Sequence, residues 1–472
     1  MEEKKNGEGK HSFAPFWWIL FFPFIFLLLL FIAIVCFSFR VSSTIVSTPV
    51  RYTQKEKEAI EENSFQSCYE VNYDNLLNNK ETVSATFSSS YQDFAYKVYA
   101  PFLEEEKNSS YSPLGLYSSL HLASLASDAS GEREFESVLG STKEERKENY
   151  LRMVSFNHEE SERGISKLYS SIFFDSQRGE TPSASYLEEL KENDCEAYTF
   201  DGSSSVDRNK VVTYLNDRSQ DTSLYKEEDI PSTPSSNDSL GLLLLSSFDF
   251  KKNWSIPFSS SETKKDTFID PNGKSTALPF MQHTVLSTYY EYEDYLSVYD
   301  YLADGYSVQY VIPKDKNQVL KDVLEGKNYF QENEENKKEG YISLSVPKFT
   351  SASSLSFQDV LNSLGMKKVF SDKENCFSFA YQNSKDNKNY YLYELKQKNE
   401  SCFQEDGKTE HRFVARKGVK EDGVISENAS SSSPNSTTRE KVTNIKLDHS
   451  FLYVLYDEEK MPVYMGQFVG LE

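Results

Sequence analysis

The chain has 472 residues, of which 38% are hydrophobic, and a formal net charge of −22 at pH 7. This length and apolar content suffice for one large core, so the chain is not expected to be intrinsically disordered. Because a charge of this sign repels phosphate backbones, we expect no nucleic acid among its partners.

The five cysteines are Cys36, Cys68, Cys195, Cys376 and Cys402. None of them forms a CxxC pair or has histidine companions at metal-ligand spacing, so the sequence predicts no metal site, no redox pair and no cofactor. Four of the five could pair in three ways, but a core of this size needs no disulfide. We therefore expect free thiols.

The N-terminal region is predicted to anchor the protein in a membrane. Residues 14–39 form an uncharged apolar run, long enough to cross a bilayer core, which requires about 20 residues. A cleaved signal peptide and a lipoprotein are the alternatives. Val41-Ser42-Ser43 is a poor cleavage site, and Val35 before Cys36 is too bulky for a lipoprotein signal. We expect a short cytoplasmic tail at 1–13, a signal anchor at 14–39 and a stalk at 40–85, with the remaining residues outside the cell.

The first folded elements are expected from about Thr86. Ser112 is suited to cap a helix, and Pro113 fits the first helical position, where its missing N–H is not needed. Leu116 and Leu120 then form an apolar face. This pattern indicates a buried helix, and His121 within it is interpreted as a core histidine rather than a ligand.

The C-terminal third contains two strand patterns and a complete helix pattern. Residues 342–346 alternate between apolar and polar, which predicts a half-buried strand. The stretch 451–456, FLYVLY, is apolar on both alternating faces and predicts a strand covered on both sides. Between these strands Ser356 is predicted to cap a helix that Gly365 ends.

Several short motifs occur in the order in which they occur in the serpin family, and the chain resembles that family from about Phe94 to Leu471. They are the SPL-headed helix at Ser112, a short helix ending in Leu139-Gly140, Phe250-Lys251-x-x-Trp254 followed by Phe258 and Thr263, the Pro279-Phe280-Met281 stretch, Pro347-Lys348-Phe349, Leu364-Gly365-Met366, Phe370-Ser371-Asp372 and Met465-Gly466.

The resemblance implies a fold that composition alone would describe only as mixed α and β. It implies a single α/β (α+β) domain at 86–472 with three β-sheets and about nine helices. The apolar run at 14–39 adds one transmembrane helix before this domain. Residues 168–174 would form a strand, 209–222 a helix across the main sheet, and Leu242 would begin the central strand. Ser246 stands where the family usually has a buried asparagine.

The resemblance also assigns a role to a long polar stretch near the C-terminus. Residues 403–442 contain a charged segment and the run ASSSSPNSTT, which cannot bury enough apolar surface to offset the entropy of ordering. We expect an exposed loop of the reactive-centre type. Its hinge would comprise Glu405, Asp406, Gly407, Lys408 and Thr409.

The hinge and the cleavage point are both atypical of the family. Strand side chains alternate, so insertion into a sheet would turn either Lys408, Glu410, Arg412 and Arg416 inward, or Thr409, His411, Phe413 and Ala415. Counting forward from Gly407 places the scissile residue near Glu421. Counting back from Phe451 gives Arg439 and Glu440, the candidate scissile bond.

Two functions follow from the resemblance. The first is inhibition of extracellular serine proteases, with cysteine proteases as the alternative target, by loop cleavage, acyl-enzyme trapping and loop insertion. We expect this inhibitor to be a monomer. The second is a non-inhibitory binding or structural protein at the cell surface, because the hinge is charged and the loop is long. The chain has no GxSxG, HExxH, P-loop or GxGxxG motif, so no catalytic residues are predicted and we expect no enzyme.

Overall fold

The computed structural model describes residues 65–73, 75–76, 81–104, 107–161, 163–178, 180–218, 225–232, 242–382, 390–392, 395–405, 409–412 and 442–471, with only the backbone described at 409–412. All belong to one compact unit, 63–472. The expected tail (1–13) and anchor (14–39) lie outside the described residues. Among the residues that the structure describes, no helix is long and apolar enough to cross a membrane.

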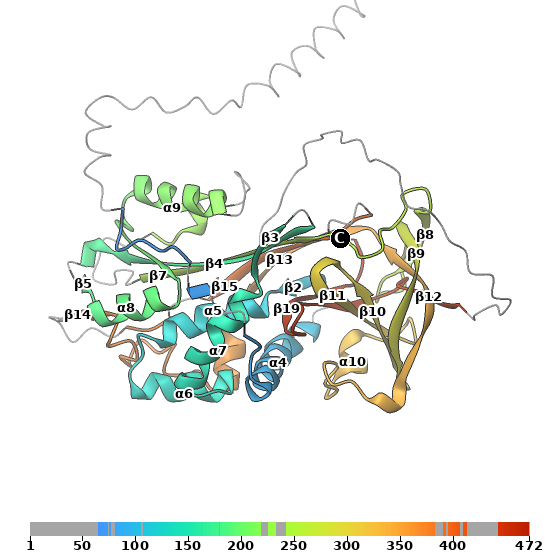
Figure 1. Ribbon diagram of the computed structural model, residues 1–472, viewed down its shortest axis with the longest axis horizontal. Coiled ribbons are helices and arrows are strands. Elements are labelled where there is room, and N and C mark those ends of the chain that lie inside the picture. Colours follow the sequence, from blue (N-terminus) through green and yellow to red (C-terminus); the bar gives the residue numbers. More distant parts are fainter. Residues whose placement is uncertain are drawn as a thin grey trace, which may run out of the picture. The chain divides into compact units, whose positions relative to one another are not determined.

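An eight-stranded sheet forms one layer of the fold (Figure 1). Its strands are, in spatial order, β1 (Gln66–Ser67), β6 (Glu196–Phe200), β4 (Gly164–Asp175), β7 (Leu242–Lys252), β16 (Thr409–Arg412), β15 (Lys396–Phe403) and β13 (Phe349–Ser356), with β3 (His158–Ser161) paired to β4. Antiparallel pairing of β4 with β7 runs over eleven positions, from Gly164 opposite Lys252 to Phe174 opposite Leu242.

A nine-stranded sheet forms the second layer. Its order is β17 (Thr443–Lys446), β12 (Lys337–Pro347), β9 (Ser275–Glu291), β10 (Tyr295–Tyr301), β11 (Ser307–Pro313), β18 (Phe451–Tyr456), β19 (Pro462–Phe468) and β2 (Ser109–Tyr111), with β8 (Lys264–Ile269) on β9. A third sheet pairs β14 (Tyr381–Gln382) with β5 (Thr181–Pro182). The described residues thus contain the three sheets that the sequence predicted.

Eight α-helices lie within the described residues, against the expected nine or so for the whole domain. They are α4 (Ala85–Tyr99), α5 (Pro113–Ser124), α6 (Ala129–Leu139), α7 (Lys143–Ser155), α8 (Ala184–Glu192), α9 (Ser205–Arg218), α10 (Leu320–Leu324) and α11 (Gln358–Leu364). Figure 1 shows α9 on one face of the eight-stranded sheet and α5 to α8 on the other.

The centre of the core is the helix that the sequence predicted after Ser112. The hydroxyl of Ser112 accepts a hydrogen bond from the Gly115 amide (3.0 Å) and caps α5. Every residue of α5 is buried. His121 is buried and its Nε2 lies 3.2 Å from Asn193 Oδ1, which confirms the prediction of a core histidine.

The C-terminal strands are covered on both faces, as their apolar pattern predicted. All residues of β18 and β19 are buried, and β18 lies between β11 and β19. Glycine is required at position 466 because a Cβ there would clash with the Tyr453 ring and the Ser109 carbonyl. The hairpin is therefore locked into the core by shape.

Two boundaries differ from the sequence predictions. The folded unit extends toward the N-terminus beyond residue 86, because Gln66 and Ser67 pair with β6 and the Leu76 side chain is buried. Ser356 was predicted to cap α11, but it ends β13 and Phe357 occupies the N-cap position. A buried aromatic at that position packs on Tyr111 and Phe102 instead of capping. Gly365 ends the helix as predicted, with φ 125°.

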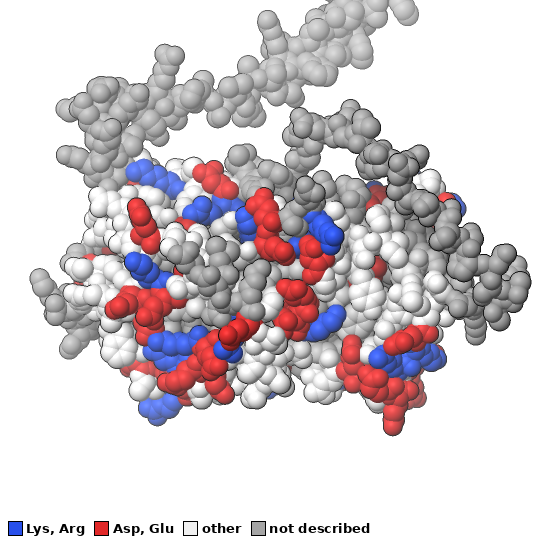
Figure 2. All heavy atoms as spheres, viewed as in Figure 1, with Lys and Arg blue, Asp and Glu red and all other residues white. Residues whose placement is uncertain are grey.

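The four cysteines in the described part of the chain are free thiols, as expected. Cys36 lies outside that part. Over the described residues, Figure 2 shows acidic and basic groups interspersed on the face in view, and many are paired, as Lys147 with Glu189.

Asp457, in the turn between β18 and β19, should make stability depend on pH. Its carboxylate is fully buried, and although Asn157 donates to it (2.9 Å), burial raises its pKa from 3.8 to about 7. The folded state therefore binds more protons between these pH values, and stability falls as pH rises from 4 to 7.

We predict that wild type loses on the order of 4 kcal/mol of unfolding free energy over this interval through Asp457. Asp457→Asn should remove that dependence, while Glu458→Gln, at the exposed neighbouring position, should retain it. Denaturant unfolding at a series of pH values measures the slopes. Equal slopes for wild type and Asp457→Asn would contradict the assignment.

Candidate functional site

The candidate site is the strand β16, which the start of the long loop adds to the middle of the eight-stranded sheet. Thr409 pairs with Lys252 and Arg412 with Asp249 on β7, while Glu400 to Cys402 of β15 pair on the other side. Both pairings are antiparallel. A segment that is expected to be loop therefore contributes a central strand.

The register determines which positions share a face with the core. Residues directly opposite each other on paired strands lie on the same face of a sheet. Position 411 lies opposite Phe250 and Ser401, both of which are fully buried, and position 409 lies opposite the buried Lys252. Of the two registers that the sequence left open, the backbone adopts the one that places 409 and 411 on the core face.

Glu405 holds the chain just before this strand. Its carboxylate accepts a hydrogen bond from the Thr263 hydroxyl (2.8 Å) and pairs with the Lys348 ammonium (2.5 Å). Burial acts to raise the pKa of Glu405, but the hydrogen bonds from Lys348 and Thr263 outweigh it and the pKa lies below its ordinary value. Glu405 is therefore charged and fixed.

Trp254 supports the same segment from the other side. Its indole N–H donates to the Gln404 carbonyl (3.0 Å), and its ring packs edge-on against Phe258. The predicted Phe250-Lys251-x-x-Trp254 motif thus supplies both the strand that pairs with β16 and the side chain that positions its entrance.

Beyond Arg412 the neighbouring strands are described with a partner on one side only. Among the described strands, β4 alone pairs with β7 over Leu242–Phe248, and β13 alone pairs with β15 over Gln397–Asn399. Backbone N–H and C=O groups in a sheet require partners. The two strands therefore present a place that a longer β16 could fill.

A layer of polar side chains lies beneath this place. Ser119 of α5 donates to the Ser246 hydroxyl (2.9 Å), which lies 3.0 Å from the Ser170 hydroxyl. Gln397 bonds the backbone of Ser112 in both directions (3.0 and 3.1 Å). Ser246, which departs from the family pattern, thus joins β7, β4 and α5 through hydroxyl groups.

The chain returns to the fold at the nine-stranded sheet. Thr443 to Lys446 form β17, which pairs in parallel with Ile342 to Ser345 of β12. The segment between β16 and β17, residues 413–441, lies outside the described residues. So do the predicted hinge residues Asp406, Gly407 and Lys408 and the candidate scissile bond, Arg439 and Glu440.

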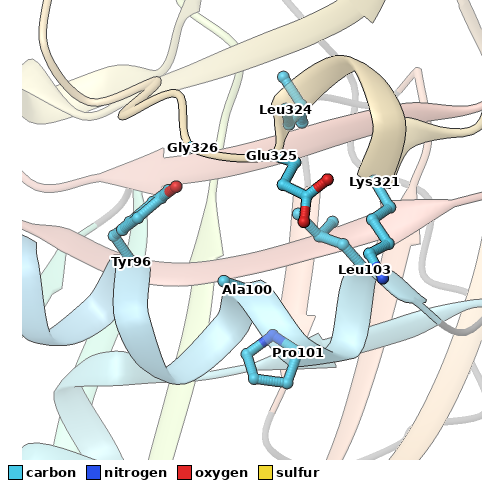
Figure 3. A pocket seen from close by; sticks show the side chains of 8 residues that line it. All are labelled: Tyr96, Ala100, Pro101, Leu103, Lys321, Leu324, Glu325 and Gly326. Atoms are coloured by element: carbon cyan, nitrogen blue, oxygen red, sulfur yellow. The ribbon is translucent and has the colours of Figure 1, made fainter.

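The structure offers few other chemical sites. Within the described residues, no group of three or more His, Cys, Asp or Glu could hold a metal ion. One hollow has a volume of about 190 Å³. Figure 3 shows it between Tyr96, Ala100 and Pro101 on one side and Lys321 and Leu324 of α10 on the other. This volume is below the roughly 300 to 1,000 Å³ of small-molecule sites.

A second hollow of about 410 Å³ lies at the nine-stranded sheet. It is lined by aromatic rings of β9, β10 and β18, among them Tyr290, Tyr299 and Tyr456. Its charged lining residues are Glu332, Lys337 and Lys460. Its volume falls within the range of ligand sites. The sequence analysis did not identify this hollow, because Tyr456 of β18 lies far along the chain from β9 and β10.

Two large sheets, a buried helix between them and a loop that enters one sheet as a central strand define the architecture of a serpin. The family described as "Serpin (serine protease inhibitor)" matches residues 89–471. The chain belongs to the serpin family. Serpins are protease inhibitors and not enzymes. The family assignment therefore confirms the prediction that this chain is not an enzyme.

Known relatives are distant in sequence. An uncharacterised serpin-like protein of Thermococcus kodakarensis is 25% identical over 233 residues, which is 48% of this chain and 50% of the relative. Thyroxine-binding globulin of Rattus norvegicus is 21% identical over 295 residues, 59% of this chain and 68% of the relative. The chain thus spans about half of the first relative and two thirds of the second.

Among solved structures, the native state of the thermophilic serpin tengpin has a TM-score of 0.67 at 19% identity and covers 83% of this chain and 96% of its own. At this identity the likeness concerns the fold.

The Glu405–Lys348 pair should stabilise the entrance to β16. Because both side chains are partly buried and hydrogen-bonded, we predict a coupling free energy of about 1 kcal/mol in a double-mutant cycle with Glu405→Ala and Lys348→Ala. Denaturation followed by circular dichroism measures it.

The exposed Lys264–Glu262 pair (3.7 Å) is the matched control, with an expected coupling below about 0.5 kcal/mol. A coupling at Glu405–Lys348 no larger than in this control would mean that the pair does not fix the loop.

Proposed function

We propose that this chain inhibits serine or cysteine proteases by offering the segment between β16 and β17 for cleavage and then inserting its first part into the eight-stranded sheet. The observation that carries the proposal is the backbone pairing of Thr409–Arg412 between β7 and β15. The family assignment supports it, since the family is described as one of serine protease inhibitors.

In this proposal the protease supplies the chemistry and the serpin supplies the strand. The protease nucleophile attacks the scissile carbonyl, the peptide C–N bond breaks, the amine leaves and an acyl-enzyme ester or thioester remains. Arg439–Glu440 is the proposed scissile bond, and an arginine there would suit a trypsin-like enzyme. Lengthening of β16 would then carry the acylated protease along the sheet before hydrolysis releases it.

The register of β16 sets how far insertion is favourable. If the register continued along β7, position 413 would lie opposite Phe248, position 415 opposite Ser246 and position 417 opposite Leu244. Phe413 and Ala415 carry no charge, but Lys417 would bring an ammonium group onto the core face. An unpaired buried charge costs several kcal/mol. Insertion would thus be least favourable where the growing strand reaches position 417.

We further propose that the protein acts outside the cell while held at the membrane by residues 14–39. The support is the uncharged apolar run at these positions, which is long enough to span a bilayer. The target would then be a protease that reaches the cell surface.

The proposal predicts that cleavage stabilises the protein. A protease that cuts between residues 413 and 441 should raise the thermal unfolding midpoint of the wild type, because new ladder hydrogen bonds and buried surface are gained. Thr409→Arg, on the core face beside Lys252, should reduce or abolish the rise and convert the protein into a substrate.

Glu410→Arg places the same side chain on the other face, opposite Lys251, and is the matched control. Scanning calorimetry before and after cleavage, with gels for the covalent protease complex, measures both effects. No rise in the wild-type midpoint, or equal rises in both variants, would count against loop insertion.

The second candidate function is non-inhibitory binding, and the tyrosine-lined hollow favours it. Its rings could stack on a flat aromatic ligand, and the Lys460 ammonium at its rim could pair with an anionic group on that ligand. One relative is named for thyroxine binding. The charge at position 417 would fit a loop that no longer needs to insert fully.

Thyroxine serves as a probe for this second function. We predict micromolar binding to wild type, about −8 kcal/mol, by isothermal titration. Thr288→Trp should fill the hollow and abolish binding, whereas Thr284→Trp, at an exposed position of the same strand, should not. Absence of binding to the wild type, or equal binding to Thr288→Trp, would exclude this hollow as the site.

A further inference from the structure

The segment before α4 is built into the edge of the eight-stranded sheet. Gln66 and Ser67 pair with Thr199 and Tyr198 of β6, and the Cys68 amide continues this contact to the Ala197 carbonyl (2.8 Å). The Leu76 amide donates to Asp194 (2.7 Å). Residues 65–73 together with Asn75 and Leu76 are called the N-terminal segment below.

One carboxylate connects the N-terminal segment to α9. Glu196, on β6, accepts hydrogen bonds from the hydroxyls of Tyr73 in the N-terminal segment and of Tyr214 on α9. Its other contacts are the Tyr198 hydroxyl (2.7 Å) and the Arg218 guanidinium at the end of α9 (2.5 Å). Burial acts to raise the pKa of Glu196, but these donors lower it overall, so the node is anionic.

A second contact lies at the other end of the segment. The Phe65 ring stacks on Tyr198 (5.3 Å between centroids), and the Lys210 ammonium of α9 lies 5.8 Å from the Phe65 ring centroid. The N-terminal segment therefore touches α9 through both an aromatic contact and the charged node.

The rest of the attachment of α9 consists of an apolar cluster and a few hydrogen bonds, among them one between the Tyr214 and Ser171 hydroxyls (2.6 Å). Val211, Val212 and Leu215 belong to a cluster separate from the main core, which they share with Phe173 and Phe200 and with the partly buried Leu243 and Leu245 of β7. Elements with few buried apolar contacts open locally at low free energy. The polar node thus adds charged hydrogen bonds to an attachment that lies outside the main core.

The position of α9 makes this attachment relevant to the loop. Leu243 and Leu245, which pack under α9, lie on the part of β7 that β4 alone pairs among the described strands. A strand that lengthened β16 to this depth would pair with this part of β7 directly under α9. Figure 1 shows α9 above β4 and β7 on that face. Such a strand requires α9 to shift.

We propose that the N-terminal segment is a latch which, through the Glu196 carboxylate, holds α9 against the sheet and so limits how fast the cleaved loop inserts. The pacing of insertion rests on the proposed function, whereas the latch itself does not. Cutting or releasing this segment would act on the inhibitor from the side of its N-terminal anchor, far along the chain from the loop.

Hydrogen exchange of the full chain tests the latch. Tyr73→Phe removes the hydroxyl that reaches Glu196, and because hydrogen bonds to charged groups are among the stronger ones, the amides of α9 should exchange about ten-fold faster. Tyr69→Phe is the matched control: it removes a hydroxyl of the same segment that donates to the Cys195 carbonyl (2.6 Å) and not to Glu196. Amides of α5 should be unchanged in both variants.

The time course of thermal stabilisation after loop cleavage tests the pacing. Faster α9 exchange and faster stabilisation in Tyr73→Phe, with Tyr69→Phe like wild type, is the expected result. Exchange of α9 within two-fold of wild type, or equal in the two variants, would overturn the latch. Faster exchange with stabilisation at the wild-type rate would overturn the pacing. If cleavage stabilises neither protein while α9 exchange still rises, the latch stands and the proposed inhibitor function fails.

Discussion

The hydrogen-bonding capacity of one strand, β7, governs much of this structure. Its backbone pairs with β4 along its whole length, but on the other side β16 pairs with only four of its residues among those described. Backbone amide and carbonyl groups in a folded protein require partners. A strand in this position accommodates more of the chain as soon as more becomes available, and its N-terminal half is covered by α9 through Leu243 and Leu245. The serine hydroxyl layer on one face of the sheet, α9 on the other face and the Glu405–Lys348 salt bridge all lie next to this side of β7.

At one level of this edge the side chains that meet are hydroxyl groups and not interdigitated apolar groups. Ser119, Ser170 and Ser246 meet there through hydroxyl groups, which are short and can exchange partners at little cost. Apolar side chains that interdigitated at this level would hold the strands in one arrangement. By contrast, β18 and β19 are buried on both faces and fixed by Gly466, where no side chain fits.

Sequence patterns predicted the elements whose signal is local. Ser112, Pro113 and the leucines after them gave α5, and the doubly apolar run at 451–456 gave β18, because capping and alternation act over a few residues. The cap of α11 was misplaced by one residue because Phe357 is held by tertiary contacts with Tyr111, which no local rule anticipates. The register of β16, the Glu196 node and the tyrosine-lined hollow all join residues more than a hundred positions apart or strands distant in the chain. The family resemblance gave the order of the elements but not these contacts.

The place where the chain re-enters the fold has a consequence for what remains after a cut. Everything beyond residue 441 forms β17, β18 and β19, and β18 and β19 are completely buried between β11 and β2. A break in the segment 413–441 therefore divides the polypeptide without dividing the particle: the two pieces stay together as a non-covalent pair, separable only by denaturation. An acylated protease would be bonded covalently to the larger piece, which also contains residues 14–39. If residues 14–39 anchor the protein as proposed, capture would leave the protease on the membrane that holds the inhibitor.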